Sequence, residues 1–279
     1  MTVASLDLPA LDVPALLNLA QAAAREAGAL VEAAWRKRPE AEHKGRVDLV
    51  TRFDRESEQL LRDRLGGGAP YEIVGEESGG QQALASDAPV WCVDPIDGTT
   101  NFVHGHPFWC VSVGMLVGRR PVLGVVVAPS LHLEWVGVAG PAGPWATRNG
   151  EACKVSDVAR LDDSLLATGF PYERENSAEN NFDAFVAIKK KCQAVRRCGS
   201  AAIDVCLVAD GTYDGYWENK LKPWDVSAGI AIARGAGGRV TGYDGLAPDV
   251  VRGQIIATNG HIHETLVRTL NDVARERIP

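Results

Sequence analysis

Long apolar runs, paired cysteines and an excess of positive charge are all missing from this sequence. The apolar runs, of which Val122 to Ala128 is an example, are too short to span a bilayer and are interrupted by Gly and Pro. The six cysteines contain no C-x-x-C pair, and disulfide frameworks are typical of much shorter secreted chains. We therefore expect no membrane span, and buried free thiols at Cys92, Cys110, Cys153, Cys192, Cys198 and Cys206.

The charge balance and the first residues exclude further classes of protein. A formal net charge of −7 disfavours a nucleic-acid surface, because such surfaces use basic patches to replace the counterions of phosphate groups. A small anionic substrate stays compatible with this charge, since bound cations can reverse the field of an acidic pocket. The N-terminal segment has acidic residues and Pro instead of the basic and apolar regions of a signal peptide, so we expect a cytoplasmic protein.

The remaining composition is that of a globular protein whose first part mixes helices and strands. With 279 residues, 46% of them hydrophobic and 23% charged, the chain can form one large domain or two packed halves. Apolar residues at helical spacing predict a helix from Val13 to Ala34. A second helix is predicted from Asp54 to Leu65, with Asp54 as its N-cap and Gly66 to Gly68 as its stop.

Short Val-rich segments separated by Gly or Pro predict the strands of this first part. Asn149-Gly150 predicts a hairpin turn, because both central residues of that turn need a positive φ. We expect residues 1–150 to form an α+β half, a mainly antiparallel sheet backed by the two helices. Its strands are Tyr71 to Gly75, Val90 to Asp94, Cys110 to Val117, Val122 to Ala128 and Leu133 to Ala139.

Residues 151–279 alternate between strand and helix patterns, which indicates an α/β half with a mixed sheet. No flexible linker separates the two halves, so we expect one compact unit divided near residue 150. The predicted strands are Leu165 to Thr168, Ala194 to Arg197, Tyr213 to Glu218 and Ile255 to Thr258. The predicted helices are Asn181 to Lys191, Gly199 to Ala209, Asp225 to Arg234 and His263 to about Arg275.

The most informative stretch is W-C-V-D-P-I-D-G-T-T-N-F, from Trp91 to Phe102. An apolar strand is expected to end at Asp94, where Pro95 forces a turn, and Asp97 follows three residues later. Both carboxylates can then point into the same space, beside free backbone N–H groups where a helix begins. Acids beside a phosphate cradle suit metal-assisted phosphoryl transfer. The alternative is an acidic turn with a capped helix, but the whole string is much more specific than Asp-x-x-Asp alone.

Two further acids occupy comparable positions. Glu76, in G-E-E-S, follows a predicted strand, and Asp225, in W-D, opens an apolar helix. By themselves they fit a solvated surface pair and an N-cap, respectively. Together, the acids at 76, 94, 97 and 225 can converge on one crevice between the two halves. An all-carboxylate set without a convincing His or Cys partner favours Mg²⁺ over Zn²⁺ or copper.

The motifs D-P-I-D-G-T-T-N-F, G-E-E-S and K-P-W-D-V-S-A-G resemble the inositol monophosphatase family in order and spacing, from Lys44 to the last strand. The segments T-G-F-P-Y (Thr168 to Tyr172) and G-S-A-A (Gly199 to Ala202) are similar to bacterial members. The resemblance implies a lithium-sensitive, Mg²⁺-dependent phosphatase with a layered αβαβα architecture, acting as a homodimer. Lys44 matches a basic residue near the site, although its interval to Val47 is one residue shorter than in animal members.

The resemblance also implies a role for each matching residue. The first metal would be bound by Glu76, Asp94 and the carbonyl of Ile96, and the second by Asp94, Asp97 and Asp225, with a looser third metal near Glu76. Thr99 and Asp54 would help to activate the attacking water, and the amides of Gly98 and Thr99 would bind phosphate. The substrate alcohol would contact Asp97, Gly199, Ser200, Ala201, Glu218 and Asp225. For Glu218 the alternative is a surface residue paired with Lys220 or Lys222.

The function expected from this resemblance is Mg²⁺-dependent hydrolysis of inositol monophosphate to inositol and phosphate by metal-activated water, without a phosphoenzyme. The Thr100-Asn101-Phe102 ending favours inositol phosphates. Fructose 1,6-bisphosphate, histidinol phosphate and NADP stay open as substrates, because fold and metal site do not fix the alcohol. A non-catalytic regulator on the same fold, with a protein or RNA partner, is the alternative of a different class.

Overall fold

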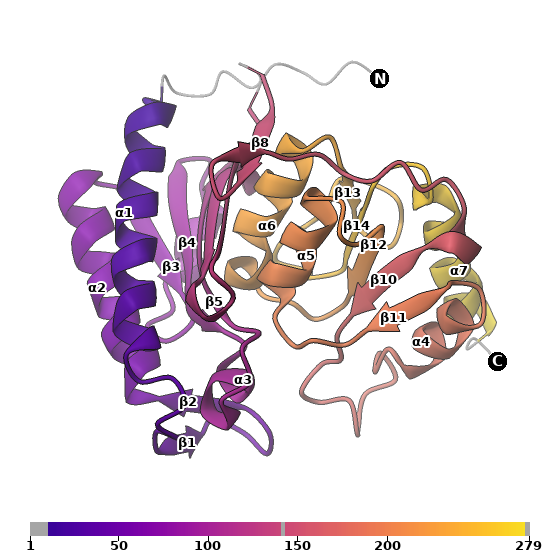
Figure 1. Cartoon of the computed structure of the whole chain (residues 1–279), viewed down its shortest axis with the longest axis horizontal. Helices are drawn as coiled ribbons and strands as arrows, with labels where there is room; N and C mark the ends of the chain where they lie inside the picture. The colour runs from indigo at the N-terminus through magenta and orange to yellow at the C-terminus, as the bar shows by residue number, and fades with distance from the viewer. Residues whose placement is uncertain (1–10, 141–142, 277–279) are drawn as a thin grey trace.

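The computed structural model describes residues 11–140 and 143–276 and arranges them in five layers (Figure 1). Helices α1 (Val13–Glu32) and α2 (Arg52–Gly68) cover one face of a seven-stranded sheet. Helices α5 (Ala201–Ala209) and α6 (Pro223–Gly235) lie between this sheet and a five-stranded sheet. Helices α4 (Phe182–Lys189) and α7 (His263–Glu276) form the last layer. The expected αβαβα architecture is confirmed.

The seven-stranded sheet has the order β3-β4-β5-β6-β7-β8-β9 and is mainly antiparallel, since only β3 and β4 run parallel. Asn149 (φ 51°) and Gly150 (φ 81°) form the turn between its last two strands, as their sequence predicts. The strands are β3 (Glu72–Gly75), β4 (Pro89–Asp97), β5 (Cys110–Val117), β6 (Arg120–Ala128), β7 (Leu133–Val138), β8 (Trp145–Arg148) and β9 (Glu151–Ala152).

The five-stranded sheet has the order β11-β10-β12-β14-β13 and is mixed. Strand β10 is parallel to both of its neighbours, and β14 is antiparallel to both of its own. The strands are β10 (Leu165–Thr168), β11 (Ala194–Arg196), β12 (Gly215–Glu218), β13 (Arg239–Thr241) and β14 (Ile255–Thr258). The other elements are the hairpin β1 (Ala41–His43) and β2 (Leu49–Thr51), helix α3 (Thr99–His104), and 3₁₀ turns at Gln81–Ala85, Pro129–Leu131 and Leu161–Asp163.

A row of glycines determines how closely α6 lies on the large sheet. Gly114, Gly124 and Gly137 are direct neighbours across β5, β6 and β7. A Cβ atom at Gly114 would lie 2.7 Å from the backbone nitrogen of Ala228, and one at Gly124 would lie 2.6 Å from the Ala228 Cα. At Gly137 the nearest atom would be the Cα of Ile232, at 2.7 Å. The helix backbone therefore rests directly on the strands, and this contact determines where the first residues of α6 lie.

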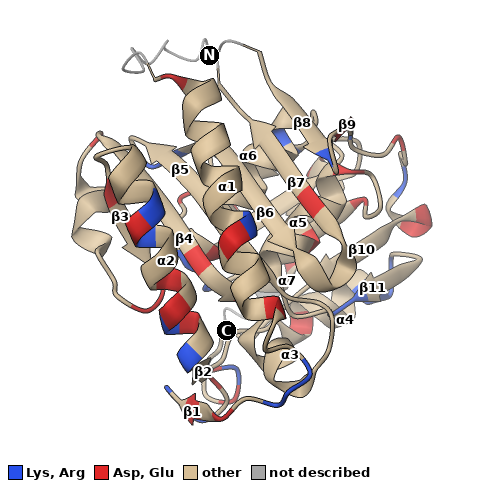
Figure 2. Cartoon of the chain, turned by 60° about the vertical axis from the view of Figure 1, so that its left-hand side comes forward, with Lys and Arg blue, Asp and Glu red and all other residues tan. Residues whose placement is uncertain are grey.

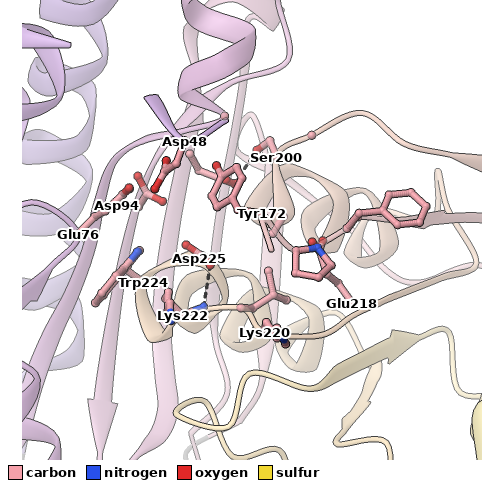
Figure 3. A pocket seen from close by; sticks show the side chains of 18 of the residues that line it. Asp48, Glu76, Asp94, Tyr172, Ser200, Glu218, Lys220, Lys222, Trp224 and Asp225 are labelled. Atoms are coloured by element: carbon pink, nitrogen blue, oxygen red, sulfur yellow. Dashed lines mark hydrogen bonds between the residues drawn. The ribbon is translucent and has the colours of Figure 1, made fainter. Parts of the chain in front are cut away.

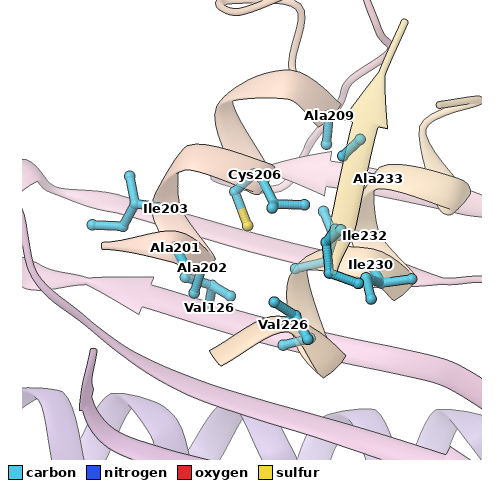
Figure 4. Packing of buried hydrophobic residues seen from close by; sticks show 14 of the residues in the cluster. Val126, Ala201, Ala202, Ile203, Cys206, Ala209, Val226, Ile230, Ile232 and Ala233 are labelled. Atoms are coloured by element: carbon cyan, nitrogen blue, oxygen red, sulfur yellow. The ribbon is translucent and has the colours of Figure 1, made fainter. Parts of the chain in front are cut away.

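The middle helix layer forms the main core (Figure 4). Ile203 and Cys206 of α5 and Ile232 of α6 are fully buried, together with Val126 of the large sheet. The layer formed by α1 and α2 packs through its apolar side chains on the opposite face of the seven-stranded sheet. Its solvent-exposed side carries interspersed charges of both signs (Figure 2). Ion pairs such as Arg64–Glu26 connect α1 with α2.

Several of the expected boundaries are wrong, and three of them matter for the packing or the site. Helix α2 begins at Arg52 with Thr51 as its N-cap, so Asp54 is the third helical residue. The helix continues to Gly68, which packs beneath Leu19 of α1, so the glycines do not stop it. Strand β4 continues past Asp94 to Asp97 through an irregularity in its pairing with β5. Pro95 fits there because an unpaired bulge position needs no backbone N–H.

The structure also bears on the thiols and on membrane spans. All six cysteines are free, as expected, but only Cys92, Cys110 and Cys206 are buried, whereas the other three are partly exposed. Within the described ranges, every helix is too short or too polar to cross a bilayer.

Candidate active site

A cavity of about 600 Å³ opens where the large sheet, the N-termini of α5 and α6, and the end of β12 meet. Nearly all the site residues predicted from the sequence line it, although they come from elements up to 149 positions apart. Asp54 is the exception: it lies behind the cavity, fully buried, and is hydrogen-bonded to Thr99. The predicted residues that line the cavity are Glu76, Asp94, Ile96, Asp97, Gly98, Thr99, Gly199, Ser200, Ala201, Glu218 and Asp225.

The bulge in β4 determines the orientation of Asp94 and Asp97. The backbone nitrogen of Ile96 donates to Oδ1 of Asp94 at 3.0 Å, which holds that side chain over the turn. Asp97 is held from the other half of the chain, because its Oδ2 accepts from Ser200 Oγ at 2.6 Å and from the Ala202 nitrogen at 2.7 Å. The N-terminus of α5 is thereby joined to the end of β4 by a carboxylate.

Asp225 is likewise held through one oxygen. It is the third residue of α6, not the N-cap, which is Lys222. Its Oδ2 accepts from the Lys222 backbone nitrogen at 2.7 Å. Capping therefore uses only one oxygen, and the side chain faces the same space as Asp94 and Glu76 (Figure 3).

Glu76 depends on a buried acid that sequence reasoning missed. Glu58 of α2 is 2% exposed and accepts from the backbone nitrogens of Glu77 and Ser78, at 2.7 and 3.0 Å. These bonds hold the turn after β3. A signal existed in the sequence, because Glu58 falls in the apolar stripe of α2 with Leu61 and Leu65. Lys44, whose role was left open, bonds Glu76 at 2.9 Å and Glu77 at 2.5 Å.

Thr99 and Asp54 form a buried pair. Oγ1 of Thr99 lies 2.9 Å from Oδ1 of Asp54 and 2.9 Å from the Ile96 carbonyl oxygen, and its single proton can serve only one of them. The other oxygen of Asp54 accepts from the backbone nitrogen and the hydroxyl of Thr51, both at 2.7 Å. Both carboxylate oxygens of Asp54 are therefore held by hydrogen-bond partners, and Asp54 orients the Thr99 hydroxyl.

Gly98 and Asn101 join the motif to the second half of the chain. Gly98 has φ 95°, and a Cβ there would lie 2.9 Å from the Phe108 carbonyl oxygen, so glycine is required on both grounds. The side-chain amide of Asn101 donates to the carbonyls of Phe108 at 2.7 Å and Cys198 at 2.8 Å. Sequence reasoning used Asn101 only as part of a motif and missed this positioning contact.

Burial and mutual repulsion govern the electrostatics of these acids. Burial raises the pKa of Asp97 to about 6 and that of Glu76 to about 7, from the usual 3.8 and 4.5. Burial likewise raises the pKa of Asp94 and Asp225 well above the usual value. The negative charges of Glu76, Asp97 and Asp225 add to this effect at Asp94. A cation bound among these groups would offset both the desolvation of the carboxylates and their mutual repulsion.

The donor chemistry fits a hard divalent cation. All the candidate donors are carboxylate or carbonyl oxygens, which Mg²⁺ prefers. The second oxygens of Asp94 and Asp225 make no hydrogen bond within residues 11–140 and 143–276. In the same ranges, no group of three or more His, Cys, Asp or Glu side chains is arranged to hold a metal ion as it stands. The acids nevertheless line one common cavity.

Glu218 lies farther along the cavity (Figure 3). It accepts a hydrogen bond from the Tyr216 hydroxyl, and it packs against Gly169, where any side chain would collide with the carboxylate. Burial raises the pKa of Glu218 to about 7. The alternative pairing with Lys220 or Lys222 is wrong, since Lys220 bonds Ser177 Oγ at 2.6 Å and the described residues show no ion pair between Glu218 and either lysine.

The chain matches known proteins over nearly its whole length. A model of the inositol monophosphatase family matches residues 12–275. The inositol-1-monophosphatase of Synechocystis sp. is 42% identical over 260 residues, covering 93% of this chain and 90% of that protein. The Nus factor SuhB of Escherichia coli is 34% identical, covering 92% of this chain and 96% of that protein. The structure of inositol monophosphatase from Anabaena superposes with a TM-score of 0.84 and 39% identity, covering 94% of this chain and 97% of that one.

Proposed function

Because the chain belongs to the inositol monophosphatase family and is thereby a phosphatase, we propose that it hydrolyses inositol monophosphate to inositol and phosphate with Mg²⁺ as its cofactor. One observation carries this proposal. Acids from the turn after β3, from β4 and from α6 meet at one cavity, and the three aspartates are each held through one oxygen by hydrogen bonds. Such fixed, desolvated oxygens are suited to binding metal ions beside a phosphate ester.

The proposed metal ligands are those named from the sequence: Glu76, Asp94, the carbonyl of Ile96, Asp97 and Asp225. When bound, two or three Mg²⁺ ions would lower the pKa of water and offset the charge that develops on the leaving oxygen. The name of a 42% identical relative, the inositol-1-monophosphatase of Synechocystis sp., supports the choice of alcohol.

The protein's own groups would orient the attacking water. If the Thr99 proton is donated to Asp54, the lone pairs of Thr99 Oγ1 are free to accept a hydrogen bond from water beside Glu76. The fixed carboxylate of Asp54, bonded twice by Thr51, keeps the hydroxyl in that orientation. The amides of Gly98 and Thr99 would bind the phosphate oxygens. No covalent phosphoenzyme is needed in this scheme.

The substrate alcohol would lie toward α5 and β12. There it can contact Asp97, Glu218, Asp225 and the segment from Gly199 to Ala201, all of which line the cavity. We also propose that the chain acts in the cytoplasm as a homodimer, a state that light scattering coupled to size-exclusion chromatography measures directly.

The experiment that tests the function is a phosphate-release panel with and without Mg²⁺. The substrates are inositol 1-phosphate, fructose 1,6-bisphosphate, histidinol phosphate, NADP and p-nitrophenyl phosphate. We expect Mg²⁺-dependent release that is fastest from inositol 1-phosphate and that ceases in EDTA. Release unaffected by EDTA, or a clear preference for another ester, would overturn the metal or the substrate assignment, respectively.

A regulator on the same fold is a second candidate, favoured by the 34% identity to the Nus factor SuhB. The two functions can be separated with Asp97→Asn, because Asp97 belongs to the proposed metal site and is only 9% exposed, so it offers little surface for contact with a partner protein. Loss of hydrolysis with an unchanged phenotype in a strain that depends on the gene would favour the regulator. Loss of both would favour the enzyme.

A further inference from the structure

A buried carboxylate that neither the family roles nor the sequence motifs use lies beside Glu218. Asp204 stands in the first turn of α5, is 1% exposed and lines the same cavity. Its Oδ1 is buried without a hydrogen-bond partner, and no hydrogen bond among the described residues engages its Oδ2. Native proteins satisfy nearly all buried polar groups, so an exception of this kind needs an explanation.

Helix capping does not explain Asp204. The N-cap of α5 is Ser200, whose hydroxyl accepts from the Ile203 nitrogen. A carboxylate in the first turn of a helix is stabilised by the helix dipole. A solvent-exposed carboxylate would receive the same stabilisation without the free-energy cost of desolvation. Burial raises the pKa of Asp204 well above its usual value, and the charge of Glu218 adds to this effect. The local structure therefore gives no reason to keep a carboxyl group here.

Two other residues that line the cavity, Glu218 and Arg197, indicate what kind of ligand Asp204 can bind. Glu218 offers its other oxygen to the cavity, since only one oxygen is engaged by Tyr216. Arg197 lines the same cavity, and its positive charge partly offsets the effect of burial, which raises the pKa values of Asp204 and Glu218. The guanidinium makes no hydrogen bond or ion pair within residues 11–140 and 143–276. The carboxylate of Asp204 and the guanidinium of Arg197, both unpaired within the described part of the chain, and the free oxygen of Glu218 thus line the same cavity.

Only some ligands can satisfy both kinds of group. A hydroxyl both donates to a carboxylate and accepts from a guanidinium, whereas an ammonium would be repelled by Arg197 and an apolar group would leave the acids unpaired. We propose that Asp204, together with Arg197, binds hydroxyl groups of the leaving alcohol and restricts the enzyme to phosphate esters of neutral polyols. This rests on the proposed function and adds two specificity-determining residues to Glu218.

Two substitutions test the proposal. Asp204→Asn keeps the size of the side chain and removes its charge. We expect kcat/KM for inositol 1-phosphate to fall by about tenfold relative to kcat/KM for p-nitrophenyl phosphate, mainly through KM. Arg197→Gln should change the same ratio in the same direction. Because Arg197 is exposed, this variant keeps the test available if Asp204→Asn does not fold.

The matched control is Asp210→Asn. Asp210 is the buried acid at the opposite end of α5, and it accepts from Trp135 Nε1 at 2.9 Å, away from this cavity. This variant should lose stability without changing the ratio of the two esters. If Asp204→Asn behaves like Asp210→Asn, Asp204 is structural and the proposal is wrong. A wild-type preference for histidinol phosphate, which carries an ammonium, would overturn it as well.

Calorimetric titration with myo-inositol makes the test independent of turnover. We expect the Asp204→Asn variant to bind myo-inositol about tenfold more weakly than the wild type. If the wild type hydrolyses no ester but shows this difference, the proposed function fails while the role of Asp204 stands. Equal affinities would overturn the role of Asp204 and leave the proposed function untouched.

Discussion

The contact between α6 and the large sheet predicts that Gly124→Ala will impair both stability and activity. The added methyl group would lie 2.6 Å from the Cα of Ala228 and 2.7 Å from its carbonyl carbon, where ordinary contacts begin at 3.4 Å. The colliding atoms are backbone, so no side-chain rotation can relieve them. Helix α6 must therefore move away from β6 by at least about 0.8 Å at this point.

The magnitude follows from this displacement. Overpacking of a tight interior typically costs 1–3 kcal/mol, and a collision between backbones belongs at the upper end, so we expect about 3 kcal/mol. For a chain of this size that lowers Tm by roughly 6–10 °C. Asp225 stands one turn before Ala228, so the same movement displaces a proposed metal ligand. A shift of about 1 Å can cost 100-fold, and we expect kcat/KM to fall between about tenfold and 100-fold.

Two other glycine substitutions serve as controls for thermal melts and steady-state kinetics. Gly66→Ala adds the same methyl group in α2, where no atom lies within 4 Å, and should raise stability by roughly 0.5–1 kcal/mol. Gly137→Ala presses on Ile232, two turns beyond Asp225, and should lower Tm with a smaller effect on activity. A Tm for Gly124→Ala within about 1 °C of the wild type would refute the packing argument. A lower Tm with unchanged kcat/KM would refute the link to Asp225.

Three further predictions concern the acids. Asp97→Asn should lower kcat at least about 100-fold with an unchanged circular dichroism spectrum, because Asp97 would bind a metal ion whose positive charge offsets the charge on the leaving oxygen; full turnover would contradict this role. Li⁺ should inhibit by competing at the site formed by Asp94, Asp97 and Asp225, as the family resemblance implies, and identical inhibition curves for LiCl and NaCl would contradict it. In the metal-free protein, stability should fall as the pH rises from 4.5 through about 7, because Glu76 and Glu218 retain protons in the folded state that they have lost in the unfolded state. Mg²⁺ should therefore raise Tm more at about pH 8 than at about pH 5, and an equal rise at both would count against its binding to these groups.

Local sequence determined the backbone around Asp94 and Asp97. Pro95 and Gly98 fix the turn that places Asp94 and Asp97 near one another, because proline and a positive φ restrict the chain whatever surrounds it. Asn149-Gly150 fixes a hairpin for the same reason. The approximate order of helices and strands followed from residue patterns, whereas the layered αβαβα architecture was predicted from the resemblance of the motifs to a known family.

Boundaries that depend on distant contacts could not be predicted in this way. The glycines at the end of α2 were expected to stop the helix, but Gly68 packs beneath Leu19, and this contact with α1 outweighs the low helix propensity of glycine. Asp54 has the sequence of an N-cap, yet Thr51 takes that place and leaves Asp54 to bond Thr99, 45 positions away.

The sequence by itself determined which acids stand at strand ends and helix starts, and it made a metal-dependent phosphatase the natural hypothesis. Only the tertiary structure decided which oxygen of each acid is held, that Glu58 supports the turn at Glu76, and that Asp204 lies unpaired beside Glu218. The physical reason is the distance along the chain over which each kind of interaction acts. Backbone preferences act over a few residues, whereas the meeting of Asp97 with Ser200 depends on how the middle helices pack between the two sheets.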